Sequence, residues 1–277
     1  MSSANPPRTV VFTGVAPGLS LPISTATAFI KAGLKNIALL GPVIEYLEVV
    51  EQHLLRYGLD VNIVVQQVQL ISTESLGLAS HNVRSQLGAW DVFVHCSSPV
   101  IQSHSSDSNQ PSEHCLDTQQ PARTPIRGAD EDLWWEPFER NVRSLHHIAR
   151  HFFPKMKANA TFINIVTTTN NNDCDDRNSA ERASQLAAIK VVEYLGRENQ
   201  SSGLRVMNVQ SLPAKLDKIT GRMTSSERTG DFFVWCTSDR AAIFNRKFVP
   251  AEYTVDELLQ AEEQLSRTEA LTAGIVK

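Results

Sequence analysis

The sequence predicts an α/β fold in which helices cover both faces of a doubly wound parallel sheet. Short apolar runs of strand length alternate regularly with longer segments of helical period along the chain. Parallel strands need a crossover between them, and a helix is the usual crossover. The chain has 277 residues, of which 42% are hydrophobic. This size suits one large domain with a full core, and we expect a single domain over residues 1–277.

The expected elements alternate in a simple order. Strands are expected at 10–12, 36–40, 61–65, 90–94, 162–166 and 204–209, where the residues are mostly apolar and β-branched. Helices are expected at 21–32, 43–57, 72–87, 134–157 and 179–198, where apolar residues recur at helical spacing. Gly33 and Gly58 follow the first two helices, as is typical of a helix C-terminus.

Two segments interrupt this alternation. Residues 101–130 are polar, with many Ser, Gln, Pro and His, and have no apolar period, so we expect a long loop there. Residues 167–178 are rich in Asn and Asp and predict a second loop. Both loops follow the C-terminal ends of strands. In an open parallel sheet, ligands bind at that edge.

Composition and charge exclude several classes of partner. The formal net charge of −4 favours neither nucleic acid nor an anionic membrane, so a small-molecule substrate is expected. The four cysteines show no C-x-x-C spacing and indicate reduced thiols in the cytoplasm. No apolar run is long enough for a signal peptide or a membrane span. His114–Cys115 and the acidic run 173–176 fit no metal-site spacing, so no metal is expected.

A glycine-containing turn follows the first predicted strand. Residues 13–20 read TGVAPGLS. This resembles the TGxxxGxG turn of the short-chain dehydrogenases/reductases, which brings the backbone close to a pyrophosphate at a helix N-terminus. Gly14 and Gly18 stand at the first two glycine positions, and Ser20 stands at the third. Pro17 removes one backbone N–H from the turn.

The resemblance to the short-chain dehydrogenases/reductases extends over nearly the whole chain. It rests on the W-x-x-F-x-x-N-V pattern within 134–143, on 162–165 and 186–198, on 233–238 with 245–249, and on a fungal-like tail at 255–258 and 271–276. It implies a Rossmann-type sheet of about seven strands. It also implies a homo-oligomer that assembles through helices 134–157 and 179–198.

The same resemblance locates the catalytic positions of the family, and most of them are changed. Family members move a hydride between a nicotinamide and a carbonyl or alcohol. A tyrosine transfers the proton, a lysine four residues on assists it, a serine polarises the carbonyl, and an asparagine supports a water relay. Glu181 stands in place of the tyrosine, Gln185 in place of the lysine and Thr167 in place of the serine; Asn141 is retained.

These replacements change what the site can do. Thr167 keeps a hydroxyl, but Gln185 has no charge with which to assist a neighbour. As a carboxylate, Glu181 cannot donate the proton that carbonyl reduction needs, although it can act as a base, or as an acid if it is buried. An alternative interpretation makes Glu181 a solvated residue near a helix N-terminus, where the helix dipole favours an acid.

The cofactor positions are altered as well. The family's NNAG after the fourth strand reads His95-Cys96-Ser97-Ser98 here. Gln69 and Pro42 replace the acidic and basic residues that commonly meet the dinucleotide, so Gly14, Gly18 and Ser20 are interpreted as vestigial cofactor residues. We expect no bound cofactor, with NADP(H) as the alternative. His95 is either a catalytic residue or a hydrogen-bonded structural histidine. The lid that family members carry near 213–230 is expected to be shortened.

Three functions follow from these observations. The first is an enzyme with the short-chain dehydrogenase/reductase fold that has lost redox activity. It would catalyse a cyclisation, isomerisation or other proton transfer on a small metabolite of fungal-like specialised metabolism. Its candidate catalytic residues are Glu181, Thr167, Asn141, His95 and Gln185. The second is an NADPH-dependent reductase of altered mechanism. The third is a non-catalytic binding or scaffold subunit.

Overall fold

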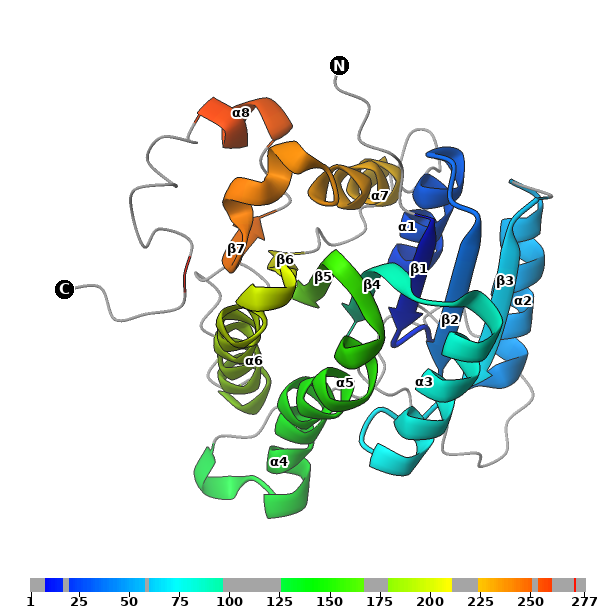
Figure 1. Ribbon diagram of the computed structural model, residues 1–277. Coiled ribbons are helices and arrows are strands. Elements are labelled where there is room, and N and C mark those ends of the chain that lie inside the picture. Colours follow the sequence, from blue (N-terminus) through cyan, green and yellow to red (C-terminus); the bar gives the residue numbers. More distant parts are fainter. Residues whose placement is uncertain are drawn as a thin grey trace.

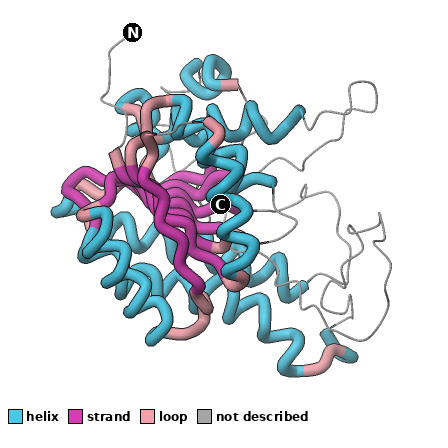
Figure 2. The backbone as a smooth tube through the Cα atoms, turned by 90° about the vertical axis from the view of Figure 1, so that its right-hand side faces the viewer, coloured by secondary structure: helices cyan, strands magenta, loops and turns pink. Residues whose placement is uncertain are grey.

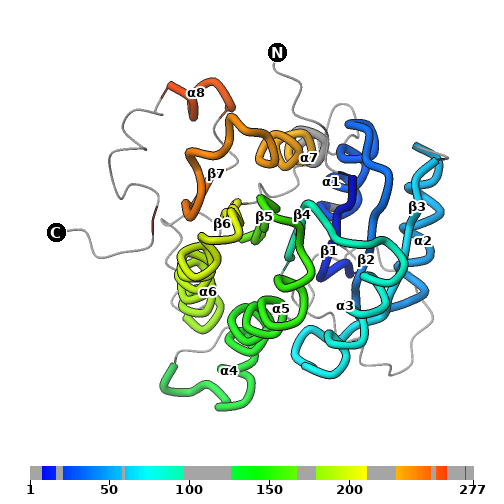
Figure 3. Tube along the Cα trace, viewed as in Figure 1, coloured from blue at the N-terminus to red at the C-terminus, as the bar shows by residue number. Residues whose placement is uncertain are grey.

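One seven-stranded parallel sheet forms the centre of the molecule. The computed structural model describes residues 8–16, 20–57, 60–96, 126–166, 179–210, 224–250, 254–260 and 272. The strand order is β3-β2-β1-β4-β5-β6-β7, and every neighbouring pair is parallel (Figure 1). The order reverses after β1, so the chain winds outward first in one direction and then in the other (Figure 3). The predicted doubly wound sheet is confirmed.

The strands are short and mostly buried. They are β1 Thr9–Thr13, β2 Asn36–Gly41, β3 Asn62–Gln67, β4 Trp90–Cys96, β5 Met156–Val166, β6 Arg205–Gln210 and β7 Lys247–Pro250. All five residues of β1 are buried, as expected for a strand covered on both faces. The edge strand β3 is more exposed.

The helices form two layers, one on each face of the sheet (Figure 2). One core cluster joins the sheet to α1 Ser20–Lys31, α2 Ile44–Leu55, α7 Thr224–Cys236 and α8 Val255–Gln260. The other joins it to α3 Thr73–Leu87, α5 Ser144–Phe152 and α6 Ser179–Glu198. A further helix, α4 Glu131–Phe138, packs against α6. Among the described helices, none combines the length and apolar character that crossing a bilayer requires.

Two predictions of helix and loop bounds were wrong. The single helix expected at 134–157 is α4, a π-helical turn at Glu139–Arg143 and then α5, and β5 already begins at Met156. Residues 156–159 are only partly apolar, so the pattern concealed the start of this strand. The shortened lid expected near 213–230 ends earlier than predicted, because α7 begins at Thr224, and residues 211–223 lie outside the described residues. Of the loop expected at 101–130, residues Ile126–Gly128 form a 3-10 turn and the rest up to 125 lies outside the described residues.

A row of polar side chains crosses the sheet near its C-terminal edge. Thr13, His95, Asn164 and Asn208 lie at matched registers of β1, β4, β5 and β6. All four are at most 2% exposed. Asn164 Nδ2 donates to Asn208 Oδ1 at 2.9 Å, and Asn208 Nδ2 donates to the carbonyl of Ile189 at 3.1 Å. Buried polar groups need such partners, so this row fixes α6 against the sheet at the level of the site.

Gly14 lies where β1 leaves the sheet, close against the end of β4. Its φ is +76°, and a Cβ atom on it would lie 1.7 Å from the carbonyl oxygen of Cys96. The backbone therefore requires glycine here for packing within the chain, whether or not a cofactor binds.

We predict that Gly14→Ala destabilises the protein far more than Gly88→Ala. Gly88 has a similar φ of +74°, but a Cβ atom added to it would meet nothing within 4 Å. Backbone strain should cost each variant about 1–3 kcal/mol. The clash with Cys96 should cost Gly14→Ala at least about 2 kcal/mol more, or prevent folding. Urea unfolding of both variants measures the difference, and equal costs would contradict the close packing.

Candidate functional site

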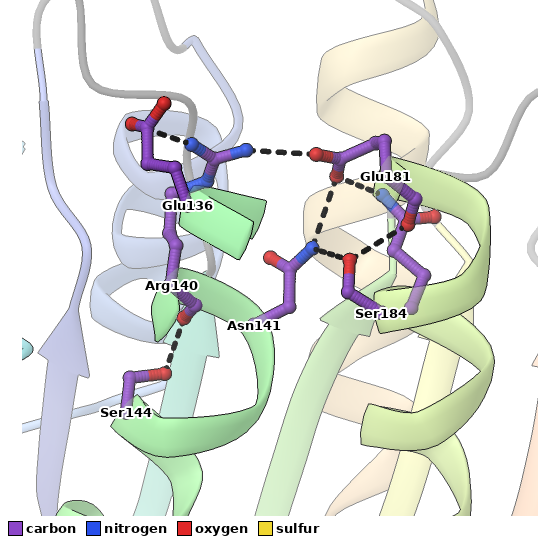
Figure 4. Close-up of polar contacts among 7 residues, drawn as sticks. Glu136, Arg140, Asn141, Ser144, Glu181 and Ser184 are labelled. Carbon is purple, nitrogen blue, oxygen red and sulfur yellow. Dashed lines mark hydrogen bonds and ion pairs between the residues drawn. The ribbon is translucent and has the colours of Figure 1, made fainter. Parts of the chain in front are cut away.

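Glu181 links helix α6 to the π-helical turn that precedes α5, at the C-terminal side of the sheet. It lies in the first turn of α6 and faces the π-helical turn between α4 and α5 (Figure 4). Arg140 Nη2 lies 2.7 Å from Glu181 Oε2, and Arg140 Nη1 lies 3.2 Å from Glu136 Oε1. The Arg140 side chain is only 8% exposed, so its charge is shared between two carboxylates that are about one-third exposed.

Two amide groups also donate to the Glu181 carboxylate. Asn141 Nδ2 lies 3.1 Å and Gln185 Nε2 lies 2.7 Å from Oε1. With Arg140, three donors therefore converge on one carboxylate, and the hydrogen bond from the guanidinium is charge-assisted. Gln185, which the resemblance places at the family's lysine position, supplies an uncharged donor to Glu181. The predicted pair is thus brought into direct contact.

Asn141 has one buried acceptor that no described donor satisfies. Its Nδ2 donates to Glu181 Oε1 and to Ser184 Oγ at 2.9 Å. The amide orientation follows from these partners, since the Ser184 hydroxyl itself donates to the carbonyl of Glu181 at 2.9 Å. Among the described residues, none donates to Asn141 Oδ1, although Asn141 is only 1% exposed. A buried orphan acceptor of this kind marks a place for a further donor.

The π-helical turn places Arg140 and Asn141 together at the site. The N–H of Ser144 donates to the carbonyl of Glu139, five residues back, so the carbonyl of Arg140 loses its usual partner. The Ser144 hydroxyl replaces that partner and donates to Arg140 O at 2.5 Å. The wide turn buries both Arg140 and Asn141, whereas Arg143 at its end is exposed. Such single turns occur frequently at functional sites.

His95 lies beneath the site and is completely buried. Its Nδ1 is 2.9 Å from Thr13 Oγ1, and its Nε2 is 3.4 Å from Ser144 Oγ. Burial lowers the pKa of His95 to about 3, so the ring is neutral at physiological pH. Burial likewise raises the pKa of the neighbouring Cys96 thiol to about 12. These contacts match the structural interpretation of His95, and no described contact joins it to Glu181.

The end of β2 offers no charged side chain to a dinucleotide. Strand β2 ends at Gly41 and is followed by Pro42, so neither a carboxylate nor a guanidinium is present to meet the ribose. Gln67 Nε2 instead donates to the carbonyl of Pro42 at 2.8 Å. Gly18 and Thr167 lie outside the described residues, and so does the side chain of Ser20. The roles expected of Gly18, Ser20 and Thr167 therefore remain predictions.

Sequence reasoning missed Arg140 and Ser184. Arg140 follows Glu136 by four residues, a spacing at which opposite charges on a helix interact, and this was the available indication. Its second partner is 41 positions away, and no local pattern indicates such a contact. No group of three or more His, Cys, Asp or Glu side chains suited to a metal ion occurs within the described part of the chain.

The fold can be compared with known structures. No protein-family model matches the sequence, and no curated protein matches it. A short-chain dehydrogenase/reductase from Serratia marcescens matches with a TM-score of 0.69 at 14% identity, over 88% of this chain and 95% of that chain. The chain has the short-chain dehydrogenase/reductase fold. A short-chain dehydrogenase from Mycobacterium smegmatis gives 0.69 at 15% identity, over 89% and 92% of the two chains. An enoyl-[acyl-carrier-protein] reductase (NADH) from Aquifex aeolicus gives 0.66 at 16% identity, over 88% and 94%.

We predict that His95 makes the protein less stable as the pH falls. Its pKa is about 3 in the folded chain and near 6.5 in an unfolded one, so the unfolded state binds the proton first. The free energy of unfolding should therefore fall between pH 6.5 and 3, by up to about 1.4 kcal/mol per pH unit from this group. His95→Asn should remove that part of the slope. Urea unfolding at pH 7, 6 and 5 measures it; identical slopes for both proteins would show that His95 is not the cause.

We predict that Arg140→Met destabilises the protein by about 2–4 kcal/mol, because it leaves two partly buried carboxylates without their cation. Arg143→Met is the matched control, since Arg143 lies in the same turn and pairs with Glu139 at 2.6 Å, but the pair is 57% and 45% exposed. It should cost less than about 1 kcal/mol. Thermal and urea unfolding compare the two variants. Similar losses would argue against a special role for the Arg140 contacts.

Proposed function

We propose that this protein is a non-redox enzyme that transfers a proton within a small organic substrate, by isomerisation or cyclisation, with Glu181 as the base. The observation that carries this proposal is the convergence of Arg140, Asn141 and Gln185 on the Glu181 carboxylate. All three groups donate to Glu181, so its oxygens act as acceptors here, which is the role of a base and not that of a proton donor to a reduced carbonyl. Proton abstraction and return leave the substrate's electron count unchanged, so the step needs no nicotinamide.

Two features support a substrate class. The orphan acceptor Asn141 Oδ1 would receive a hydroxyl, enol or N–H donor of the substrate. On the same helical segment, the rings of Trp134, Trp135 and Phe138 lie against one another, with Trp135 half exposed. Trp134 also connects α4 to α6, because its Nε1 donates to Ser179 Oγ at 3.2 Å. A flat, largely apolar skeleton with one donor group suits this surface.

A second candidate function is a non-catalytic binding protein, and the ion pair of Arg140 with Glu181 favours it. The Glu181 carboxylate is already held at 2.7 Å from the Arg140 guanidinium, which is the geometry of a structural ion pair. On this view Glu181 fastens α6 to the π-helical turn, and the site only holds its ligand. The two candidates differ in whether Glu181 moves a proton.

We predict that the protein exchanges acidic C–H hydrogens of cyclic enones in D2O and that Glu181→Gln reduces this exchange at least about 100-fold. Glu136→Gln is the matched control, because Glu136 shares Arg140 but is proposed to take no part in the chemistry; it should stay within about threefold of wild type. NMR of a panel of bicyclic enones measures exchange. Binding without exchange would favour the second candidate.

The same samples test the remaining alternative, an NADP(H)-dependent reductase. One similar structure is an NADH-dependent reductase complexed with NAD. Here, 1 mM NADPH should raise the melting temperature by less than about 1 °C, since a ligand far below its dissociation constant adds no stability. Micromolar NADPH binding together with carbonyl reduction would overturn the proposed function.

A further inference from the structure

A chain of buried hydrogen bonds connects the end of strand β1 to the π-helical turn. Thr13 Oγ1 lies 2.9 Å from His95 Nδ1, His95 Nε2 lies 3.4 Å from Ser144 Oγ, and Ser144 Oγ donates to the carbonyl of Arg140 at 2.5 Å. The last of these contacts is visible in Figure 4. The side chains of Thr13, His95 and Ser144 are at most 1% exposed. Each polar group in the chain therefore depends on the other members for its hydrogen bonds.

The Ser144 hydroxyl fixes the direction of the contact with His95. A hydroxyl carries one proton, and a carbonyl oxygen can only accept. The proton of Ser144 therefore points to the carbonyl of Arg140, where the distance is shortest. Ser144 Oγ is left as the acceptor toward the ring, so His95 Nε2 must carry the proton of that contact.

The tautomer of His95 follows from this direction. Burial lowers the pKa of His95 to about 3, so the ring is neutral near pH 7 and has a single N–H. With that proton on Nε2, Nδ1 is an acceptor and receives the hydroxyl proton of Thr13. All the donors in the chain therefore point the same way, from β1 toward the π-helical turn.

The carbonyl at the end of this chain is the one that the π-helical turn leaves without a backbone donor. The N–H of Ser144 donates to the carbonyl of Glu139 and not to that of Arg140. In a regular α-helix the same N–H would bond to Arg140 O, so the backbone has an alternative register at this point. The Ser144 hydroxyl satisfies Arg140 O without that change, and His95 holds the hydroxyl from its other side.

The position of the turn matters because it carries two of the donors to Glu181. Arg140 Nη2 and Asn141 Nδ2 donate to the Glu181 carboxylate at 2.7 and 3.1 Å. The buried chain ends on the backbone of Arg140, the same residue whose side chain contacts Glu181. A change of register in the turn would therefore move both donors relative to α6.

We propose that His95 is a positioning residue, which acts through the Ser144 hydroxyl to hold the π-helical turn and thereby Arg140 and Asn141 in place around Glu181. The effect on catalysis rests on the proposed function, in which Glu181 is the base, whereas the effect on the turn does not. A histidine that only filled space in the core would need no particular nitrogen toward Ser144.

Two substitutions of His95 separate its contacts. The amide nitrogen of His95→Gln reaches the place of Nε2 and can still donate to Ser144. The shorter side chain of His95→Asn reaches only the place of Nδ1, so it can meet Thr13 but not Ser144. Ser144→Ala removes the hydroxyl itself.

Ser80→Ala is the matched control for the loss of a buried serine hydroxyl. Ser80 donates to the carbonyl of Gly77 at 2.9 Å and contacts Lys155, and none of its hydrogen bonds to described residues reaches the Glu181 site. Circular dichroism and melting temperatures establish that each variant is folded.

The first readout is 15N NMR of the full chain at pH 7, and it does not require activity. The His95 ring is assigned by the signals that disappear in His95→Gln, and the Asn141 side-chain amide by those that disappear in Asn141→Asp. We expect wild-type His95 to carry its proton on Nε2. In Ser144→Ala we expect a mixture of tautomers and shifted Asn141 amide signals, and in Ser80→Ala neither change.

The second readout is the exchange of substrate C–H hydrogens in D2O, with kcat and KM measured separately. His95→Asn and Ser144→Ala should lower kcat at least about tenfold and change KM less than about threefold, because misplaced groups slow the reaction step itself. His95→Gln should retain at least about a third of the wild-type kcat, as should Ser80→Ala, since both keep the contact between position 95 and Ser144 or leave it untouched.

A proton on Nδ1 of wild-type His95, or equal losses of kcat in His95→Gln and His95→Asn, would overturn the proposal. If the wild type exchanges no C–H hydrogen, the proposed function fails, and the NMR readout decides the positioning role alone. Unchanged Asn141 amide signals in Ser144→Ala would then overturn it. If Ser144→Ala does not fold, the same signals are compared in the two His95 variants, and only His95→Asn should shift them.

Discussion

The charge of Arg140 is the constraint that organises the site. A guanidinium only 8% exposed must have carboxylate partners, because an unpaired buried charge is strongly destabilising. Glu136 satisfies one side of it from within the same helix, and Glu181 satisfies the other from α6. The presence of an acid at position 181 therefore depends on the arginine at position 140. A tyrosine at 181 would leave Arg140 short of a partner, and a lysine at 185 would bring a second cation close to it.

This coupling gives the altered positions one physical explanation. Taken separately, Glu181 and Gln185 are two positions at which the resemblance predicts that family residues have been replaced. In the structure they are two members of a hydrogen-bonded set that also includes Arg140, Asn141 and Ser184. Asn141 contacts the carboxylate directly through its Nδ2, and its oxygen has no donor among the described residues.

Much of the fold could be predicted from sequence because the pattern was strong where burial was complete. Strands such as β1 and β2, covered on both faces, gave bounds within one or two residues. The prediction of element bounds failed where apolar and polar residues are mixed along the segment. The partly polar start of β5 at Met156 reads as a helix end, and a π-helical turn has no sequence pattern of its own. Of the site, alignment predicted Glu181, Gln185 and Asn141 as neighbours, but Arg140 depends on a contact between distant segments that no periodicity encodes.

The π-helical turn also determines the direction in which each side chain of α5 points from the helix axis. It inserts one extra residue into what would otherwise be a continuous α-helix, so each side chain of α5 is turned by about 100° relative to an uninterrupted continuation of α4. Ser144 thereby faces His95 on strand β4, while Arg143, His146 and Arg150 face outward. Deleting this single residue would turn α5 so that its cations face the core and its apolar side chains face outward, so the length of the turn matters to the packing of the whole helix.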